Sequence, residues 1–170
     1  MKKVILSAIA LFFFTATQAQ DLFTAARENN VTEIENLVKA NQDVNAKDKR
    51  GFTPLILAIY NSNIEAAKLL IEKGADVNAQ DFSGNNALMG AIFKGNEEAV
   101  RLLIENNADV NQLNRNNASS LIFAATFGKM PIIKMLLDAG AKKDVKDNTG
   151  KSAFDHALIQ ENTEVIELLK

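Results

Sequence analysis

The feature that most constrains the fold of this chain is a pattern that recurs at one fixed interval, the interval that separates Leu55 from Leu88. Residues 48–80 show the unit best, and the blocks at 81–113 and 114–146 copy the positions of its glycines, helix caps and apolar side chains. The copied apolar positions include Leu55, Leu88, Leu121 and Phe154, then Ala58, Ala91, Ala124 and Ala157, then Leu70, Leu103, Leu136 and Leu169. A degenerate copy at 21–47 precedes the unit, and a shortened copy at 147–170 follows the last full block. Such a period predicts an array, because a single unit cannot bury its apolar face without a neighbour.

Each unit predicts two short helices. Thr53 is a favoured N-cap residue, and Pro54 suits the first helical turn, where its missing N–H costs nothing. The equivalents of Thr53 are Asn86, Ser119 and Ser152, which are also good caps. The apolar spacing predicts helices near 22–28, 32–40, 54–61, 65–72, 87–94, 98–105, 120–127, 131–138, 153–160 and 164–169. Helices this short are unstable alone, so their stability must come from stacking.

Glycine and asparagine mark the turns of the template. Gly74 stands where the second helix ends and a left-handed backbone is needed, and its equivalents are Asn41, Asn107 and Gly140. Gly51, Gly84, Asn117 and Gly150 mark a turn between repeats, and Ser62, Gly95, Gly128 and Glu161 mark the turn between the two helices. Gly90 is the only glycine that falls on none of these positions.

These motifs resemble those of a known family. The run Asp48-Lys49-Arg50-Gly51-Phe52-Thr53-Pro54-Leu55, with Ala58, Leu69-Leu70 and Gly74-Ala75-Asp76-Val77-Asn78-Ala79, is similar to the ankyrin repeat, a helix-turn-helix and β-hairpin unit. The resemblance covers Asp21 to Lys170 and implies an all-α solenoid with β-hairpin-like connecting loops. The polar copies at 21–47 and 147–170 suit the N-terminal and C-terminal capping repeats. Ile56, Met89, Ile122 and Asp155 stand where the family usually carries a histidine, so the hydrogen bond of that histidine is not expected here.

Residues 1–19 do not belong to the array. Lys2 and Lys3 precede an apolar run at 4–14, and Thr17 and Ala19 fit the small residues before a cleavage site. This pattern predicts a signal peptide, which would leave a domain at 20–170 and a periplasmic or secreted protein. The alternative is an uncleaved anchor, but the apolar run is shorter than the roughly 20 residues that a bilayer needs.

Charge and cysteine content exclude several classes of function. Without Lys2 and Lys3 the chain has 17 basic and 21 acidic side chains, a net charge of −4. An acidic chain without a basic stripe is a poor ligand for nucleic acid, and no basic amphipathic segment predicts membrane binding after cleavage. With Cys 0, thiol catalysis, thiolate metal sites and cysteine-linked lipid anchors are excluded.

Candidate catalytic and metal-binding residues are few. His156 is the only histidine, and Ser152 and Asp155 nearby suggest a triad. A triad also needs a correctly placed third partner and an oxyanion hole, which the sequence does not supply. Ser152 is better interpreted as an N-cap and His156 as a contact histidine. The Asp-Val-Asn runs at 76–78 and 109–111 lack the spacing of calcium loops and are interpreted as hairpin residues. We therefore expect no enzyme activity, no cofactor and no metal.

The remaining candidate site is a surface. In ankyrin-like stacks the hairpin tips and the first helices form a concave groove, and aromatic side chains recur at the matching positions here. Aromatic residues often anchor protein contacts, although some of these rings are expected to pack on neighbouring repeats. The residues predicted to bind a protein are Lys49, Arg50, Phe52, Tyr60, Phe82, Phe93, Lys94, Arg115 and Phe127. Their positive charges suit a partner with an acidic rim. Gly90 either opens a notch for a partner side chain or makes room for Phe123.

Two classes of function follow. The first is an exported, monomeric binding module that docks a protein partner and acts as an accessory factor, scaffold or inhibitor. The resemblance to exported ankyrin proteins implies, as a more specific form, support of an envelope stress-defence enzyme, and a host or rival-cell protein is the other possible partner. The second class is an enzyme with an unrecognised carboxylate or hydroxyl site, which the sequence favours much less.

Overall fold

The computed structural model describes residues 21–127 and 129–170. The predicted signal peptide, its cleavage site and the predicted turn at Gly128 lie outside the described residues. The helices are α1 (Leu22–Arg27), α2 (Val31–Lys39), α3 (Pro54–Tyr60), α4 (Ile64–Glu72), α5 (Ala87–Lys94), α6 (Glu97–Glu105), α7 (Ser120–Thr126), α8 (Met130–Asp138), α9 (Ala153–Ile159) and α10 (Thr163–Leu169). Each predicted boundary agrees with the structure to within one residue, because caps and turn residues mark both ends of every helix.

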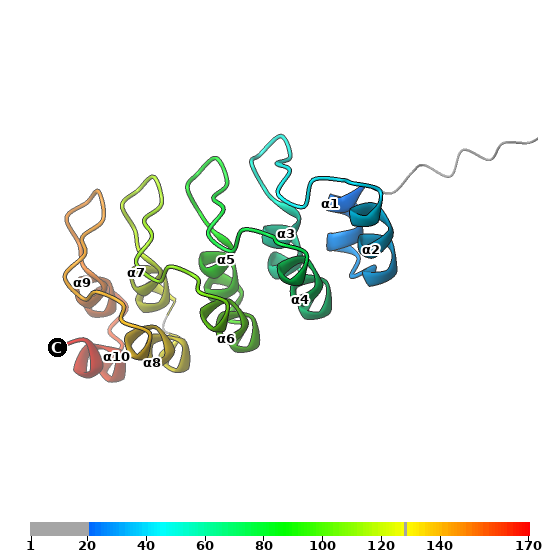
Figure 1. Ribbon diagram of the computed structural model, residues 1–170. Coiled ribbons are helices and arrows are strands. Elements are labelled where there is room, and N and C mark those ends of the chain that lie inside the picture. Colours follow the sequence, from blue (N-terminus) through cyan, green and yellow to red (C-terminus); the bar gives the residue numbers. More distant parts are fainter. Residues whose placement is uncertain (1–20, 128) are drawn as a thin grey trace, which may run out of the picture.

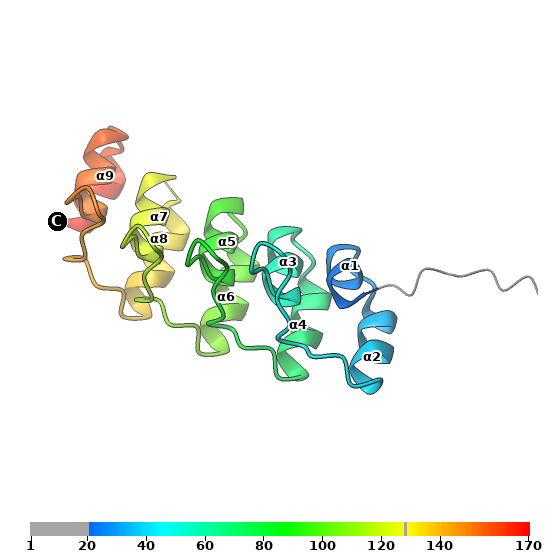
Figure 2. The ribbon, with the colours of Figure 1, turned by 90° about the horizontal axis from the view of Figure 1, so that it is seen from above.

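The helices form antiparallel pairs that stack in two layers (Figures 1 and 2). The first helices α1, α3, α5, α7 and α9 pack in one layer, and the second helices α2, α4, α6, α8 and α10 pack in the other. Contacts are more extensive between neighbouring first helices than between neighbouring second helices. The described residues contain no strand, so the architecture is the expected all-α solenoid.

The predicted caps are present. The side chains of Thr53, Asn86 and Ser119 accept hydrogen bonds from the backbone N–H groups of Ile56, Met89 and Ile122. Ser152 caps α9 in the same way, and the Asp155 carboxylate bonds back to the backbone N–H of Ser152. All three caps of α3, α5 and α7 are buried, where an unpaired N–H would be costly.

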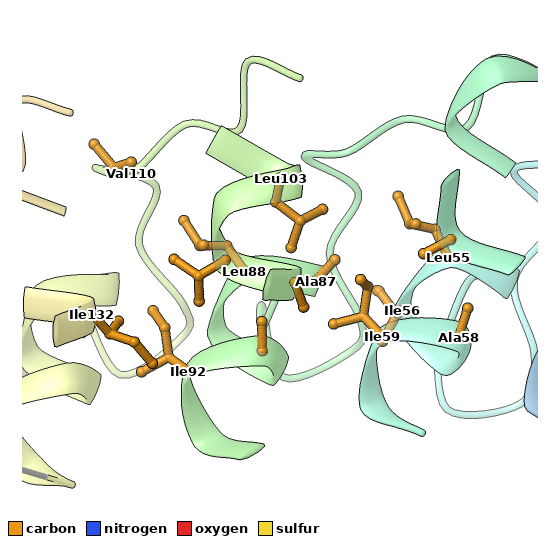
Figure 3. Close-up of a cluster of buried hydrophobic side chains, with 14 of the residues drawn as sticks. Leu55, Ile56, Ala58, Ile59, Ala87, Leu88, Ile92, Leu103, Val110 and Ile132 are labelled. Atoms are coloured by element: carbon orange, nitrogen blue, oxygen red, sulfur yellow. The ribbon is translucent and has the colours of Figure 1, made fainter. Parts of the chain in front are cut away.

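The core runs continuously along the stack rather than forming one central cluster. Leu55 and Ile59 of α3, Leu88 and Ile92 of α5 and Leu103 of α6 are fully buried and lie in successive repeats (Figure 3). Ile56, Met89 and Ile122 are also buried, so apolar packing replaces the histidine that the family usually carries there. Each repeat therefore gains its buried surface from its neighbours.

Four loops among the described residues project as fingers beside the first helices (Figure 1); their tips are residues 48–52, 81–85, 114–118 and 147–151. Within each tip the first residue accepts backbone hydrogen bonds on one side-chain oxygen, as Asp81 Oδ1 does from Ser83 and Asn85. Adjacent fingers are joined by one backbone hydrogen bond per junction, from Phe82, Arg115 and Asn148 to the preceding tip. The fingers are hairpin-like, as predicted, but they do not form a regular ladder.

Asparagine side chains join the bases of neighbouring loops. The Asn78 side chain donates to the Asn107 carbonyl and accepts from the Asp109 N–H, and Asn45 and Asn111 make the equivalent pairs of bonds. The carboxylate of Asp76 accepts from the N–H of Asn78 within the same turn. The Asp-Val-Asn runs thus have a structural role between repeats, which confirms their interpretation as loop residues.

Candidate functional site

Three exposed aromatic rings and one partly buried ring form a row across consecutive first helices. The rings of Tyr60 and Phe93 are stacked with centroids 5.9 Å apart, and Phe127 meets Phe93 edge-on at 5.3 Å. Phe123 lies tilted against Phe127 at 6.3 Å. Tyr60, Phe93 and Phe127 are 42%, 47% and 41% exposed, respectively, although each touches another ring. We call Tyr60, Phe93, Phe127 and Phe123 the aromatic row.

The ends of the first helices position this row. Tyr60 is the last residue of α3, Phe93 lies in the last turn of α5, and Phe127 directly follows α7. Because the helices are short and parallel to one another, side chains at their ends come close across repeat boundaries. Tyr60 and Phe93 occupy the same template position in consecutive repeats. In the next repeat that position holds Thr126, and the ring stands on the following residue, Phe127.

Two of the predicted basic residues lie on aromatic rings. The guanidinium carbon of Arg50 is 4.5 Å from the Phe52 ring centroid, and Lys94 Nζ is 4.9 Å from that of Tyr60. Both contacts are in the range of cation–π attraction. Lys49 and Arg115 are exposed on the 48–52 and 114–118 fingers. Positive charge therefore borders the aromatic row.

Phe52 and Phe82, which were also predicted to bind a partner, lie outside the aromatic row. Phe52 is half-buried and packs against the core, so only part of its ring is available. Phe82 is 54% exposed, but it lies at the tip of the 81–85 finger beside Gly51, where a β-carbon on Gly51 would come within 2.7 Å of Phe82 Cδ1. The structure thus brings together Tyr60, Phe93, Lys94 and Phe127, and it places Phe82 on the finger side.

Two pockets lie between the fingers and the first helices. The first, the Gly90 pocket, has a volume of about 300 Å³ and is lined by Phe52, Ile56, Tyr60, Asp81, Ser83, Asn85, Asn86, Met89, Gly90, Phe93 and Phe123. The second, the His156 pocket, has a volume of about 310 Å³ and is lined by Asn114, Asn116, Ala118, Ile122, Phe123, Thr126, Phe127, Asp147, Asn148, Thr149 and His156. Rings of the aromatic row line both pockets, and Phe123 is common to the two linings; we call the two pockets together the groove.

His156 is held by a carboxylate. Its Nε2 lies 2.7 Å from Asp147 Oδ2, and both side chains are largely buried. Asp147 Oδ1 accepts from the backbone N–H groups of Thr149 and Lys151 and from the Thr149 hydroxyl. Hydrogen bonds from His156, then from Thr149, hold the pKa of Asp147 well below its ordinary value of 3.8.

The suspected triad is not assembled. The Ser152 hydroxyl donates to Asp155 Oδ2 and accepts from the Asp155 N–H, as a helix cap does. The hydrogen bond from the Ser152 N–H, then the one from the Ser152 hydroxyl, lowers the pKa of Asp155. His156 pairs with Asp147 on the finger instead. Ser152 is thus the predicted cap and His156 the predicted contact histidine.

Replacing Asp147 with asparagine should lower the free energy of unfolding at about pH 7. Because the folded-state pKa is lower than 3.8, the carboxylate stabilises the fold above that pH and loses this contribution as the pH falls through the folded-state pKa. The deficit of Asp147→Asn should therefore shrink on acidification below 3.8, as measured by urea unfolding at a series of pH values. Asp81→Asn is the matched control, because it keeps the finger bonds and removes no imidazole contact. A pH-independent deficit would contradict the assignment.

Steric crowding does not require a glycine at position 90. A β-carbon built there would meet one atom within contact distance, Tyr60 Cδ2 at 3.5 Å, which is an ordinary van der Waals separation. Phe123 lines the same pocket as Gly90 but does not come within 4 Å of this β-carbon, so Phe123 does not by itself require a glycine here. Gly90 leaves open the space of the pocket that bears its name.

Four residues of the groove were missed by the sequence analysis as site residues: Asp81, Phe123, Asp147 and His156. The signal that could have found the acids is one template position at the start of each finger, which holds Asp48, Asp81, Asn114 and Asp147. Leu57, Gly90, Phe123 and His156 likewise share one template position on the first helix. The recurrence marks both template positions, but only the fold shows that they face each other.

Within the described part of the chain, no three His, Cys, Asp or Glu side chains are grouped so that they could hold a metal ion. Over residues 21–127 and 129–170, no helix has both the length and the apolar character needed to cross a membrane.

Two family models match the chain. A model of ankyrin repeats in three copies matches residues 22–114, and a model of ankyrin repeats in many copies matches residues 102–157. No curated protein matches the chain. The two matched segments together include both pockets and the whole aromatic row.

Proposed function

Because the chain belongs to the ankyrin repeat family, whose repeats are generally protein–protein interaction modules, we propose that it is an exported module that binds a protein partner in the groove beneath its fingers. In this proposal the protein acts as a monomer and performs no chemistry itself. The partner contacts the aromatic row and the two pockets that the row borders.

The observation that supports this proposal most is the exposed aromatic row. Apolar side chains on a surface usually occur singly, whereas Tyr60, Phe93 and Phe127 adjoin one another and remain more than two-fifths exposed. Rings that are already packed side by side lose little conformational entropy when a partner covers them. Aromatic residues of this kind dominate the binding energy of protein interfaces.

The charges near the row favour one kind of partner. Arg50 and Lys94 lie on aromatic rings at the edge of the Gly90 pocket, and Lys49 and Arg115 lie on the finger tips. A partner with an acidic rim would be steered towards these groups, although the chain as a whole is acidic. We therefore expect association to slow as the salt concentration rises.

Partner binding is tested by removing the rings. Capture of an envelope protein by cross-linking, followed by a measured Kd for the purified pair, should show that Tyr60→Ala or Phe93→Ala weakens binding by about 2 kcal/mol or more. The triple variant Tyr60→Ala, Phe93→Ala and Phe127→Ala should lose the partner while its circular-dichroism spectrum stays helical.

Leu113→Ala is the matched control for this experiment. Leu113 is an exposed apolar residue outside the aromatic row, so its loss should leave the Kd unchanged. Unchanged capture of every partner by the triple variant would place the binding site on another face. If the captured protein is an enzyme, its activity with and without the module distinguishes an inhibitor from an accessory factor, including one that supports a stress-defence enzyme.

Export is the second part of the proposal and is supported by the sequence of residues 1–19. The mature protein should begin at Gln20, with or without cyclisation of that glutamine. N-terminal mass analysis of protein recovered from the envelope fraction measures this directly. Recovery of a soluble cytoplasmic product that retains Met1 would contradict export.

The enzyme alternative has little support in the groove. The side chains of Ser152 and Asp155 are engaged in the capping box of α9, and His156 is paired with Asp147. A nucleophile activated by a base, with donors for an oxyanion, would be expected of a hydrolytic site. The module is therefore better described as a binding surface than as a catalytic one.

A further inference from the structure

The two pockets of the groove are formed by equivalent template positions, two repeats apart. Moving two repeats along the chain relates Ile56 to Ile122, Tyr60 to Thr126, Asp81 to Asp147, Ser83 to Thr149 and Gly90 to His156, and every one of these residues lines its corresponding pocket. The structure thus shows one pocket with an imidazole in it and an equivalent pocket without one.

Asp48, Asp81 and Asp147, which begin three of the fingers, differ in the partner of their Oδ2 atom. One oxygen of each accepts backbone hydrogen bonds within the finger. Asp48 Oδ2 pairs with Arg27 at 3.5 Å, and Asp147 Oδ2 pairs with His156 at 2.7 Å. In the remaining repeat the residue is the neutral Asn114, and the facing template position holds the apolar Phe123.

Asp81 breaks this pattern. Its Oδ1 accepts from Ser83 and Asn85 at 2.8 and 2.9 Å, but no hydrogen bond or ion pair to Oδ2 is found among the described residues. The template position that supplies the imidazole in the last repeat is Gly90 in this one, and the space there is open. The carboxylate therefore borders a pocket whose described lining lacks the imidazole partner seen in the equivalent pocket.

We propose that the Gly90 pocket receives an arginine side chain of the protein partner, which pairs with Asp81 as His156 pairs with Asp147. This inference rests on the proposed function and names the anchoring residue of the partner. A guanidinium is planar, donates hydrogen bonds to a carboxylate and stacks on aromatic rings, and the pocket is lined by Phe52, Tyr60 and Phe93.

The positive charges of Arg50 and Lys94 disfavour an arginine in the pocket, so its binding depends on the Asp81 carboxylate. Arg50 and Lys94 lie at the rings of Phe52 and Tyr60, and their charges repel an incoming cation. Asp81 is the acidic residue that lines the pocket. A weakly hydrated guanidinium is better suited to this setting than a strongly hydrated ammonium.

The pocket is tested with a small probe. Binding of N-acetyl-arginine methylamide to the purified mature chain is followed by NMR at the backbone amide of Gly90, with the lysine, glutamine and glutamate derivatives as comparison. The arginine derivative should give a saturable shift, and Asp81→Asn should weaken its binding roughly tenfold or more, as loss of a charge-assisted hydrogen bond does. Asp109→Asn is the matched control: Asp109 accepts a backbone hydrogen bond in its own loop and lines neither pocket, so the shift at Gly90 should be unchanged.

A second variant tests the pocket by filling it with a side chain of the protein itself. Gly90→His should place an imidazole opposite Asp81, raise the thermal midpoint and block the arginine derivative. The rise should shrink when Asp81→Asn is added, leaving only the gain from replacing a helical glycine. No saturable shift with the arginine derivative, equal binding by Asp81→Asn, or tighter binding of the glutamate derivative would overturn the proposal. The last result would make Arg50 and Lys94 the determinants of an acidic ligand.

Failure of this inference is distinguishable from failure of the proposed function. If the protein partner is lost on removal of the aromatic row but binds Asp81→Asn and the original chain equally, the groove binds the partner without an arginine anchor. If the partner also still binds after removal of the aromatic row, the groove itself is not the binding site.

Discussion

Replacing Leu103 with alanine should lower the free energy of unfolding by about 2–5 kcal/mol, the range for a buried leucine whose cavity the surroundings fill incompletely. Leu103 lies on α6 in the middle of the stack and is fully buried (Figure 3). Both neighbours of its repeat depend on that packing, so the loss should not be confined to one end. Urea unfolding followed by circular dichroism measures the change, and Leu136→Ala on α8 should behave similarly.

Lysine substitutions provide the control for this experiment. Lys49 and Lys94 are exposed, so their replacement by alanine should change the free energy of unfolding by about 0.5 kcal/mol or less. If these surface variants destabilised the chain as much as Leu103→Ala does, the assignment of buried and exposed faces would be wrong.

Replacing Gly84 with alanine should be nearly as damaging, for a different reason. Gly84 has a φ of +79°, and a β-carbon there would lie 2.7 Å from the backbone nitrogen of Arg115 on the next finger. An L-residue in this conformation costs roughly 1–2 kcal/mol, and forcing an extra carbon into a packed contact costs roughly 1–3 kcal/mol more. The loss should therefore be about 2–5 kcal/mol in thermal or urea unfolding.

Gly150 allows the two contributions to be separated. It occupies the same template position with a φ of +81°, but no atom of the described residues lies within 4 Å of a β-carbon built there. Gly150→Ala should thus show only the backbone cost of roughly 1–2 kcal/mol. Equal losses for Gly84→Ala and Gly150→Ala would mean that contact between neighbouring fingers contributes nothing.

The fold could be predicted closely because its signals are local. Thr53 and Pro54 begin α3 wherever the repeat is placed, and Asn107 adopts the left-handed backbone, at φ 64°, that ends a helix. The period then fixes which helices are neighbours, since each repeat can stack only on the next. Agreement between local signals and a fixed period leaves few alternative folds.

The site was harder to predict because it depends on contacts between repeats. Tyr60, Phe93 and Lys94 lie together as predicted, since they follow the template step. Phe52 and Phe82 also occupy variable positions, but Phe52 packs on the core and Phe82 on the preceding finger, which a variable position alone does not reveal.

The pairing of Asp147 with His156 could not be read from the sequence near either residue. The two are nine positions apart, one on a finger and one on a helix, and only the fold brings them within 2.7 Å. The sequence pointed instead to Ser152 and Asp155, the neighbours of His156 along the helix. The Gly90 notch was anticipated, but the Asp81 oxygen beside it, which has no partner among the described residues, was not.

The backbone hydrogen bond between neighbouring finger tips gives each junction of the array its own reporter. The amides of Phe82, Arg115 and Asn148 are each bonded to the preceding finger, although all three residues are exposed. Such an amide exchanges its hydrogen with solvent only when its finger separates from the neighbour. The exchange rates of these three amides therefore measure the opening free energy at three successive junctions, and a ligand that bridges repeats would slow only those that it spans.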